Sequence, residues 1–154
     1  MKILFYLFCF SSSLNLLSQA DYFKKNQALA DSLGIEFQIP SCLILGVGFL
    51  ESGGGKSKVA KVLNNHFGIV GKNNLPKNGN FKSKYKYYNS VTDSYIGFCN
   101  LVASKKYYSE LKGDTSIEKW AKAIASQGYA RDANAWSKYI IKLTDKQCIN
   151  SIQK

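Results

Sequence analysis

The chain has 154 residues, of which 45% are hydrophobic and 14% aromatic, enough to bury the core of one domain without a metal or disulfide framework. That composition excludes a disordered chain, and the formal net charge of +11 favours an anionic partner such as nucleic acid, acidic lipid or a carboxylate-bearing wall polymer. Arg131 is the only arginine, whereas sequence-specific recognition of nucleic acid relies on arginine, so we expect no nucleic-acid partner. A solvated lysine surface that keeps the protein soluble explains the charge equally well.

The first twenty residues predict a secretory signal peptide. Lys2 precedes an apolar stretch from Ile3 to Phe10, and a serine-rich segment ends in a small-x-small cleavage pattern at Ala20. The segment is too short and too rich in serine for a spanning helix. We therefore expect an exported domain, residues 21–154, in the periplasm, the cell envelope or outside the cell, with no stable membrane insertion. The alternatives are an uncleaved anchor and lipidation at Cys9, which lacks small residues just before it.

Two helices are expected before the first candidate site. Residues 22–33 (YFKKNQALADSL) have a helical pattern, and Gly34 is a suitable residue to end that helix. From Pro40, the run IPSCLILGVGFLE begins with proline and serine, which suit a helix N-terminus, and it is apolar on nearly all sides. A helix of that composition, ending near Ser52, belongs at the centre of the domain.

One extended excursion then interrupts the helices. In residues 67–90, Asn78-Gly79 stands between short segments rich in tyrosine and phenylalanine, which predicts a β-hairpin or an extended arm. Apolar residues recur at helical spacing in 91–102, 117–124 and 136–143. Thr115 with Glu118 predicts a capping box for the second of these helices. The residues thus predict one mainly α domain with a small β-hairpin, without an internal repeat or a linker.

Cysteine and histidine are too few for a zinc site. The mature chain keeps Cys42, Cys99 and Cys148, which have no CxxC spacing, and His66 is the only histidine. One pair of these cysteines could bridge in an oxidising compartment, in any of three ways. Cys42 and Cys99 also fit plain buried positions on apolar helical faces. We expect no metal, no cofactor and no catalytic cysteine.

Glu51 stands at the end of the apolar run and directly before three glycines, in FLESGGGKS. At the C-terminal end of a helix, the macrodipole and the apolar surroundings both disfavour the charged carboxylate, so its pKa is expected to be raised. A protonated carboxyl at the edge of a cleft is what a general acid for glycosidic-bond cleavage requires. Periodicity alone favours a plainer interpretation, in which Glu51 is the first solvated residue after a core helix capped by glycine.

Three blocks of the sequence resemble the glucosaminidase family, glycoside hydrolase family 73. FLESGGGKSKVAKVLNNHFGIVG is similar to the family pattern LESGxGxS followed by NNxFGI. GYARDANAW is similar to the family's Tyr-Ala-Thr-Asp-Pro segment, with Arg131 for threonine and Ala133 for proline, and KYYNSVTDSYIGF resembles its tyrosine-x-serine lead into a helix. The resemblance covers residues 25–145. It implies a lysozyme-like helical fold and an endo-β-N-acetylglucosaminidase that hydrolyses the β-1,4 bond after N-acetylglucosamine in peptidoglycan.

Carried over position by position, the resemblance implies two catalytic residues, and Asn65 and Phe67 match its NNxFGI positions, which shape the cleft below the sugar. Glu51 matches the catalytic acid and Tyr129 the tyrosine beside the bond to be cleaved. The candidate substrate-binding residues are Asn65, Phe67, Tyr88 and Asp132. The plainer alternatives are a helix-capping turn for Asn65, core packing for Phe67, a buried aromatic with a satisfied hydroxyl for Tyr129 and a helix cap for Asp132.

The sequence departs from the family at the second carboxylate. Family members commonly place it after NNxFGI, but residues 52–92 contain neither Asp nor Glu, which leaves Asp93 and Asp132 as candidates. Three explanations follow: the N-acetyl group of the substrate serves as nucleophile with help from Tyr129, a distant acid acts through water, or catalysis has been lost. We favour the first, because it needs no second protein carboxylate.

The predicted arm also gathers charge and aromatic rings. Lys72, Lys77, Lys82, Lys84 and Lys86 are interleaved with Phe81, Tyr85, Tyr87 and Tyr88. Rings stack on sugars and lysines attract wall carboxylates, so we expect a monomer whose partner is the glycan strand of peptidoglycan. The alternative functions are a lytic transglycosylase, which also relies on one Glu in an ESG context but has a Gly-Leu-Met-Gln segment that is absent here, and a catalytically silent wall-binding module.

Overall fold

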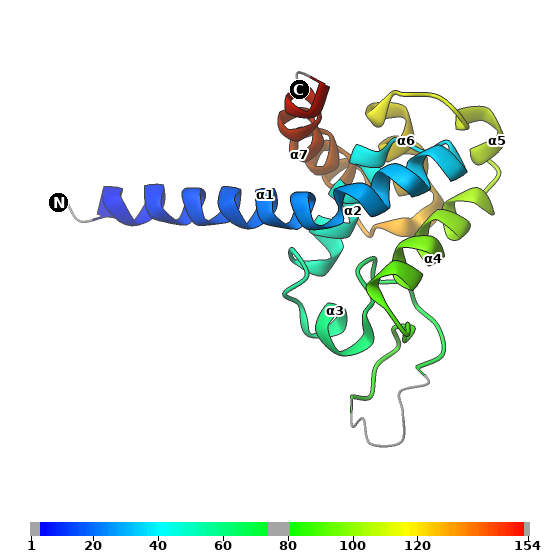
Figure 1. Cartoon of the computed structure of the whole chain (residues 1–154), viewed down its shortest axis with the longest axis horizontal. Helices are drawn as coiled ribbons and strands as arrows, with labels where there is room; N and C mark the ends of the chain where they lie inside the picture. The colour runs from blue at the N-terminus through cyan, green and yellow to red at the C-terminus, as the bar shows by residue number, and fades with distance from the viewer. Residues whose placement is uncertain (1–3, 74–80, 153–154) are drawn as a thin grey trace.

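The computed structural model describes residues 4–73 and 81–152, with side chains described for residues 19–73 and 81–145. As the sequence predicts, the protein is mainly helical (Figure 1). The elements are α1 (Leu4–Phe37), α2 (Ser41–Ser52), α3 (Lys58–Leu63), α4 (Val91–Ala103), α5 (Tyr108–Leu111), α6 (Ile117–Ile124), the π-helical turn η1 (Ala125–Tyr129) and α7 (Ala133–Ile152). Within the described ranges, no helix is long and apolar enough to cross a membrane.

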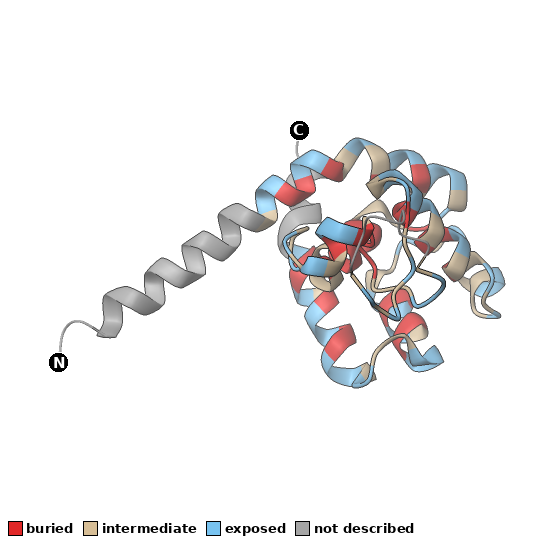
Figure 2. Ribbon diagram, turned by 90° about the horizontal axis from the view of Figure 1, so that it is seen from below, coloured by how far each residue is buried: buried red, intermediate tan, exposed pale blue. Residues whose placement is uncertain are grey.

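Helix α2 forms the centre of the body, as its apolar sequence predicts. Leu43, Ile44 and Leu45 are fully buried, and the helix packs against α1, α4, α6 and α7. A Cβ at Gly46 would lie 2.6 Å from Thr144 Cγ2, so glycine at this position allows α7 to approach α2 closely. Buried residues gather inside the globular part of the molecule (Figure 2). The central helix therefore holds its last turn, which carries Glu51, in a fixed position.

Helix α1 runs past the expected stop at Gly34 and ends at Phe37, so that boundary was predicted wrongly. Gly34 has a packing role instead: a Cβ there would lie 3.0 Å from the Ile39 carbonyl oxygen and 3.3 Å from Ser41 Cβ, where the chain turns back into α2. Gln38, with φ 52°, makes the left-handed turn that follows the helix. The N-terminal part of α1 extends away from the body (Figure 1).

The segment between α3 and α4 is irregular. Val70 and Tyr85 form an isolated antiparallel bridge, supported by hydrogen bonds from Gly71 N to Lys84 O at 3.0 Å and from Lys86 N to Ile69 O at 2.8 Å. Residues 67–73 and 81–90 contain no strand beyond this bridge. The expected turn at Asn78-Gly79 lies outside the described residues. The two sides of the segment therefore pair at one point, and the β-hairpin stays a prediction.

The predicted capping box before α6 is wrong by one residue. The side chain of Ser116, not Thr115, caps the helix by accepting a hydrogen bond from Lys119 N. The Asp114 carboxylate accepts from Ser116 N at 2.8 Å and pairs with Lys119, which fixes the turn before the cap. Glu118 pairs with Lys122 one turn ahead instead of reaching back. The cap moves because Asp114 holds Ser116 in place.

The two cysteines with described side chains behave differently. Cys99 is a free and fully buried thiol in α4, as its apolar surroundings predict. Burial raises its pKa to about 12, with a smaller effect from the charge of Glu36. Cys42 is half-buried and takes part in a disulfide, so of the two alternatives for this residue the disulfide is confirmed and the plain buried position is wrong. No described side chain supplies its partner.

Candidate active site

Glu51 lies in the last turn of α2, where its carboxyl group is half-buried. The indole Nε1–H of Trp136 donates a hydrogen bond of 2.8 Å to Glu51 Oε1. Burial raises the pKa of Glu51, and the hydrogen bond from Trp136 lowers it by a smaller amount. The sequence predicted the direction of this shift. It did not predict the partner.

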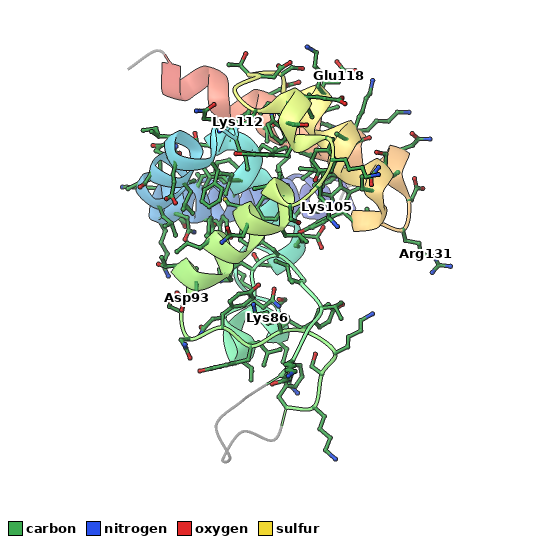
Figure 3. All side chains as sticks on the ribbon, turned by 90° about the vertical axis from the view of Figure 1, so that its right-hand side faces the viewer. Lys86, Asp93, Lys105, Lys112, Glu118 and Arg131 are labelled. Atoms are coloured by element: carbon green, nitrogen blue, oxygen red, sulfur yellow. The ribbon has the colours of Figure 1, made fainter. Side chains whose placement is uncertain are left out.

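Asp132 positions Trp136. The Asp132 carboxylate accepts a hydrogen bond of 2.9 Å from Ala135 N, and its backbone carbonyl accepts one of 3.0 Å from Trp136 N. Asp132 therefore caps α7, and Trp136 stands in the first turn of that helix facing Glu51. Arg131, the residue before the cap, projects away from the body (Figure 3). Whether Asp132 also touches substrate stays a prediction.

Tyr129 lies beside this pair. Its ring packs against Trp136 with centroids 5.5 Å apart, and its hydroxyl donates a 2.7 Å hydrogen bond to the Phe67 carbonyl oxygen. Burial raises the pKa of Tyr129 strongly, and the nearby charge of Glu51 adds to the increase. The hydroxyl therefore keeps its proton near neutral pH. Its oxygen still has a lone pair that can accept a hydrogen bond.

Asn65 and Phe67 hold the loop beside Glu51 in place. The Asn65 amide donates to the carbonyl oxygens of Ile69 and Lys86 at 2.9 and 2.8 Å, and its oxygen accepts from Phe67 N and Ile69 N. All hydrogen-bonding groups of the Asn65 side chain are thus used inside the protein. Phe67 is 1% exposed and stacks on Phe98 at 4.4 Å. These two residues set the shape of the loop that carries Gly68.

Tyr88 is buried, and its ring packs against Gly97, where an added Cβ would lie 2.5 Å from the Tyr88 hydroxyl. The Tyr88 carbonyl oxygen accepts a hydrogen bond from the Asn64 amide at 2.9 Å, and its N–H donates to Leu63 O. Lys86 Nζ lies 4.8 Å from the centroid of the Tyr88 ring. The structure places Tyr88 in the packing between the arm and α4. A sugar contact of this ring stays a prediction.

Gly68 lies next to the second carboxyl oxygen of Glu51. The residue has φ +63°, and a Cβ there would lie 3.5 Å from Glu51 Oε2 and 3.9 Å from Tyr85 Cε1. Trp136 occupies Oε1, so Oε2 is the oxygen left to carry a proton toward a ligand. Sequence reasoning did not single out Gly68 or Trp136, the two residues that lie against the Glu51 carboxyl group. The glycine between Phe67 and Ile69 was a usable signal, because a left-handed φ favours glycine.

The two candidate second carboxylates have local structural roles. Asp93 lies exposed in the first turn of α4, whose N-cap Ser90 accepts a hydrogen bond from Asp93 N at 3.0 Å. Asp132 caps α7. Figure 3 shows Asp93 and Arg131, the neighbour of Asp132, on opposite sides of the molecule. The described part of the chain contains no group of three or more His, Cys, Asp or Glu side chains that could hold a metal ion.

A comparison with known families matches most of this sequence. The family described as mannosyl-glycoprotein endo-beta-N-acetylglucosaminidase matches residues 27–148, a range that contains Glu51, Tyr129 and Trp136. Among curated proteins, none matches the chain significantly.

Solved structures with the same fold come from several bacteria. A peptidoglycan hydrolase from Sphingomonas sp. A1 is 19% identical with a TM-score of 0.67, covering 86% of this chain and 91% of its own. The glycoside hydrolase domain of Salmonella typhimurium FlgJ is 20% identical with a TM-score of 0.66, covering 88% and 91%. A type VI secretion effector–immunity complex from Pseudomonas protegens is 23% identical with a TM-score of 0.62, covering 85% and 94%. These similarities establish the fold.

Proposed function

The chain belongs to the glucosaminidase family of glycoside hydrolases, and we propose that it hydrolyses the β-1,4 bond after N-acetylglucosamine in peptidoglycan, with Glu51 as the general acid. The observation that carries this proposal is the asymmetry of the Glu51 carboxyl group. Trp136 binds Oε1, while Oε2 has no hydrogen-bond partner among the described residues and lies beside Gly68, which has no side chain to cover it. A carboxyl group whose pKa is raised by burial, with one oxygen fixed and one free, is suited to donate a proton.

The substrate class is supported by fold neighbours and by charge. Two of the structural neighbours are a peptidoglycan hydrolase and the glycoside hydrolase domain of FlgJ. The net charge of +11 suits a polymer with free carboxylates. In the arm, Lys84 Nζ lies 5.5 Å from the Tyr85 ring centroid, and Lys58 Nζ of α3 lies 4.8 Å from the ring centroid of Phe81. The half-buried rings of Tyr85 and Phe81 are available to stack on sugars of the glycan strand.

The proposed reaction uses the substrate's own acetamido group. Glu51 Oε2–H gives its proton to the glycosidic oxygen as the bond from that oxygen to C1 breaks. The carbonyl oxygen of the 2-acetamido group forms a bond to C1, which gives an oxazolinium ion. Water then attacks C1 and loses its proton to the Glu51 carboxylate, and the acetamido group is restored. The Tyr129 oxygen accepts a hydrogen bond from the acetamido N–H and holds that group under C1.

Export is part of the proposal. Peptidoglycan lies outside the cytoplasmic membrane, and residues 1–20 have the pattern of a signal peptide, so the active form comprises residues 21–154. One structural neighbour is a chain of a type VI secretion system effector–immunity complex from Pseudomonas protegens.

A digest of purified peptidoglycan tests the proposed function. Wild type is compared with Glu51→Gln and with Glu110→Gln, which makes the same change at an exposed position in α5. We expect reducing N-acetylglucosamine ends, detected by mass spectrometry before and after borohydride reduction, from wild type and Glu110→Gln. The Glu51→Gln rate should fall by about 10²- to 10⁴-fold, the range lost with a general acid. Anhydro-muramic ends would instead show that the protein is a lytic transglycosylase. Binding of the protein to the wall without any cleavage products would show that it is a catalytically silent wall-binding module.

A further inference from the structure

A cavity of about 600 Å³ lies apart from Glu51 and is not used by the proposed reaction. It is open to solvent and lined by residues of α1, the turn at Gly54 and Gly55, α3 and the start of α4. Its volume is in the range of small-ligand sites. The polar side chains that matter for its chemistry are Lys25, Asn26, Lys56, Lys61, Asn64 and His66.

His66 presents a hydrogen-bond donor to this cavity. Its ring is 7% exposed, and Nδ1 lies 2.8 Å from the Tyr22 hydroxyl. The Tyr95 hydroxyl donates to Tyr22, which leaves the Tyr22 proton to be donated to His66 Nδ1, and we assign the tautomer that this favours, with the ring proton on Nε2. Nε2 has no partner among the described residues, and no buried polar side-chain atom of that part of the chain lacks one. Nε2–H is therefore accessible, and it faces the cavity that His66 lines.

Asn26 presents the complementary acceptor. The residue is 6% exposed, and its amide nitrogen donates a 2.8 Å hydrogen bond to the Tyr22 carbonyl oxygen. Its Oδ1 has no partner among the described residues, so by the same argument this atom is accessible from the cavity. Two nearly buried side chains on neighbouring walls thus offer one donor and one acceptor, and neither is satisfied within the described chain.

The charge at the cavity is positive. Lys25, Lys56 and Lys61 line it, against a single acidic lining residue, Asp21. The ion pairs in the described ranges join Lys119 to Asp114 and Lys122 to Glu118, so Lys25 and Lys61 are not neutralised by a carboxylate of that part of the protein. Burial, and then the charge of Lys25, lowers the pKa of His66 to about 4, so the ring is neutral at pH 7.

We propose that this cavity binds an acidic peptide, with a peptide N–H donating to Asn26 Oδ1 and a carboxylate accepting from His66 Nε2–H and pairing with Lys25 and Lys61. An amide next to a carboxylate matches the donor, the acceptor and the cations together, whereas a bare anion leaves Asn26 Oδ1 unpaired. Peptidoglycan carries short acidic peptides on its glycan strands. The identification of the ligand as a wall peptide rests on the proposed function. The cavity would then anchor the peptide while Glu51 works on the sugar.

The single histidine gives a direct test by NMR, because the imidazole signals belong to His66 alone. The Glu51→Gln protein is titrated with the acidic peptide N-acetyl-L-alanyl-D-glutamate, with the diamide of that peptide and with inorganic phosphate. We expect a saturable shift of the His66 Nε2 signal with the acidic peptide and none with the diamide. A response to phosphate that equals the response to the peptide would overturn the peptide assignment, and no response to the peptide would overturn the site.

Charge variants give the matched control. Lys25→Gln with Lys61→Gln should weaken peptide binding about tenfold, the sum of two exposed charge interactions. Lys106→Gln with Lys138→Gln removes the same charge from exposed positions outside the cavity and should leave binding unchanged. Equal weakening by both pairs would contradict a defined site. Since this readout needs no cleavage, it stands or fails independently of the hydrolysis assay.

Discussion

Trp136 and Glu51, which are 85 positions apart in the chain, meet in a hydrogen bond of 2.8 Å between the indole N–H and the carboxyl oxygen Oε1. The bond fixes the orientation of Oε1, whereas Oε2 has no hydrogen-bond partner in the part of the chain that the structure describes. Because the N–H favours the charged carboxylate, it also moderates the increase in the pKa of Glu51 that burial causes. Trp136 is therefore a positioning residue for the proposed general acid.

Trp136→Phe should change the pH profile as well as the rate. Without the N–H, the pKa of Glu51 rises further, so the alkaline limb of kcat/KM, where the acid loses its proton, should move to higher pH. Without this hydrogen bond the Glu51 carboxyl group can rotate out of position, which should also lower kcat. The check is the pH dependence of peptidoglycan cleavage, with thermal unfolding measured alongside because the substitution also removes packing volume. A lower rate with an unchanged profile would mean that Trp136 acts only through packing.

Gly68→Ala should abolish most activity because the new methyl group would lie 3.5 Å from Glu51 Oε2, where the proposed reaction requires the glycosidic oxygen to approach. The left-handed φ of +63° adds strain of about 1–2 kcal/mol to the folded state. Gly113→Ala is the matched control, since its φ is +83° and its Cβ would meet Gln38. It should lose similar stability in urea unfolding and keep its rate of wall cleavage. Equal rates for both variants would show that Oε2 does not face substrate.

Features of this site that depend on neighbouring residues in the chain were predictable, whereas contacts between segments far apart in the sequence were not. The apolar run before Glu51 predicts a central helix and a carboxyl at its end, because both depend on neighbours in the chain. The same local reasoning stopped α1 at Gly34, although that glycine is needed for contact with Ile39 and Ser41. Ser116 caps α6 in place of the predicted Thr115, because the Asp114 carboxylate accepts a hydrogen bond from the backbone N–H of Ser116.

The contacts missed by sequence reasoning are those that the fold brings together. Trp136 was recognised only as one apolar position in the last helix, since nothing nearby in sequence indicates that its N–H reaches Glu51. Asn65 was assigned to substrate or to a helix cap, whereas its amide joins Ile69 to Lys86 across the arm. Such roles depend on distances between segments that periodicity does not report.

Acid should destabilise the protein through His66. The pKa of His66 is lowered to about 4 in the folded state from 6.5, so the unfolded chain binds more protons between these values. The contribution of neutral His66 to the free energy of unfolding is fully present above pH 6.5. It is lost as the pH falls, and the loss reaches about 3 kcal/mol by pH 4. Glu51 has a raised pKa and opposes this trend, so urea unfolding is best measured in the Glu51→Gln background. His66→Gln should flatten the profile between pH 7 and pH 4.5, and an equally steep profile would assign the loss to other groups.

Asp93→Asn and Asp132→Asn together should keep most of the hydrolytic activity. Asparagine caps a helix about as well as aspartate, so α7 and the position of Trp136 should be preserved. If the acetamido group is the nucleophile, no second protein carboxylate is needed, and the rate on peptidoglycan should stay within about threefold of wild type, a loss below the 10²- to 10⁴-fold effect of removing a catalytic acid or base. The same mechanism requires the acetyl group, so wild type should not cleave wall that has been chemically N-deacetylated. A folded double variant without activity would establish one of these acids as the second catalytic carboxylate, whereas cleavage of the deacetylated wall would exclude assistance by the substrate.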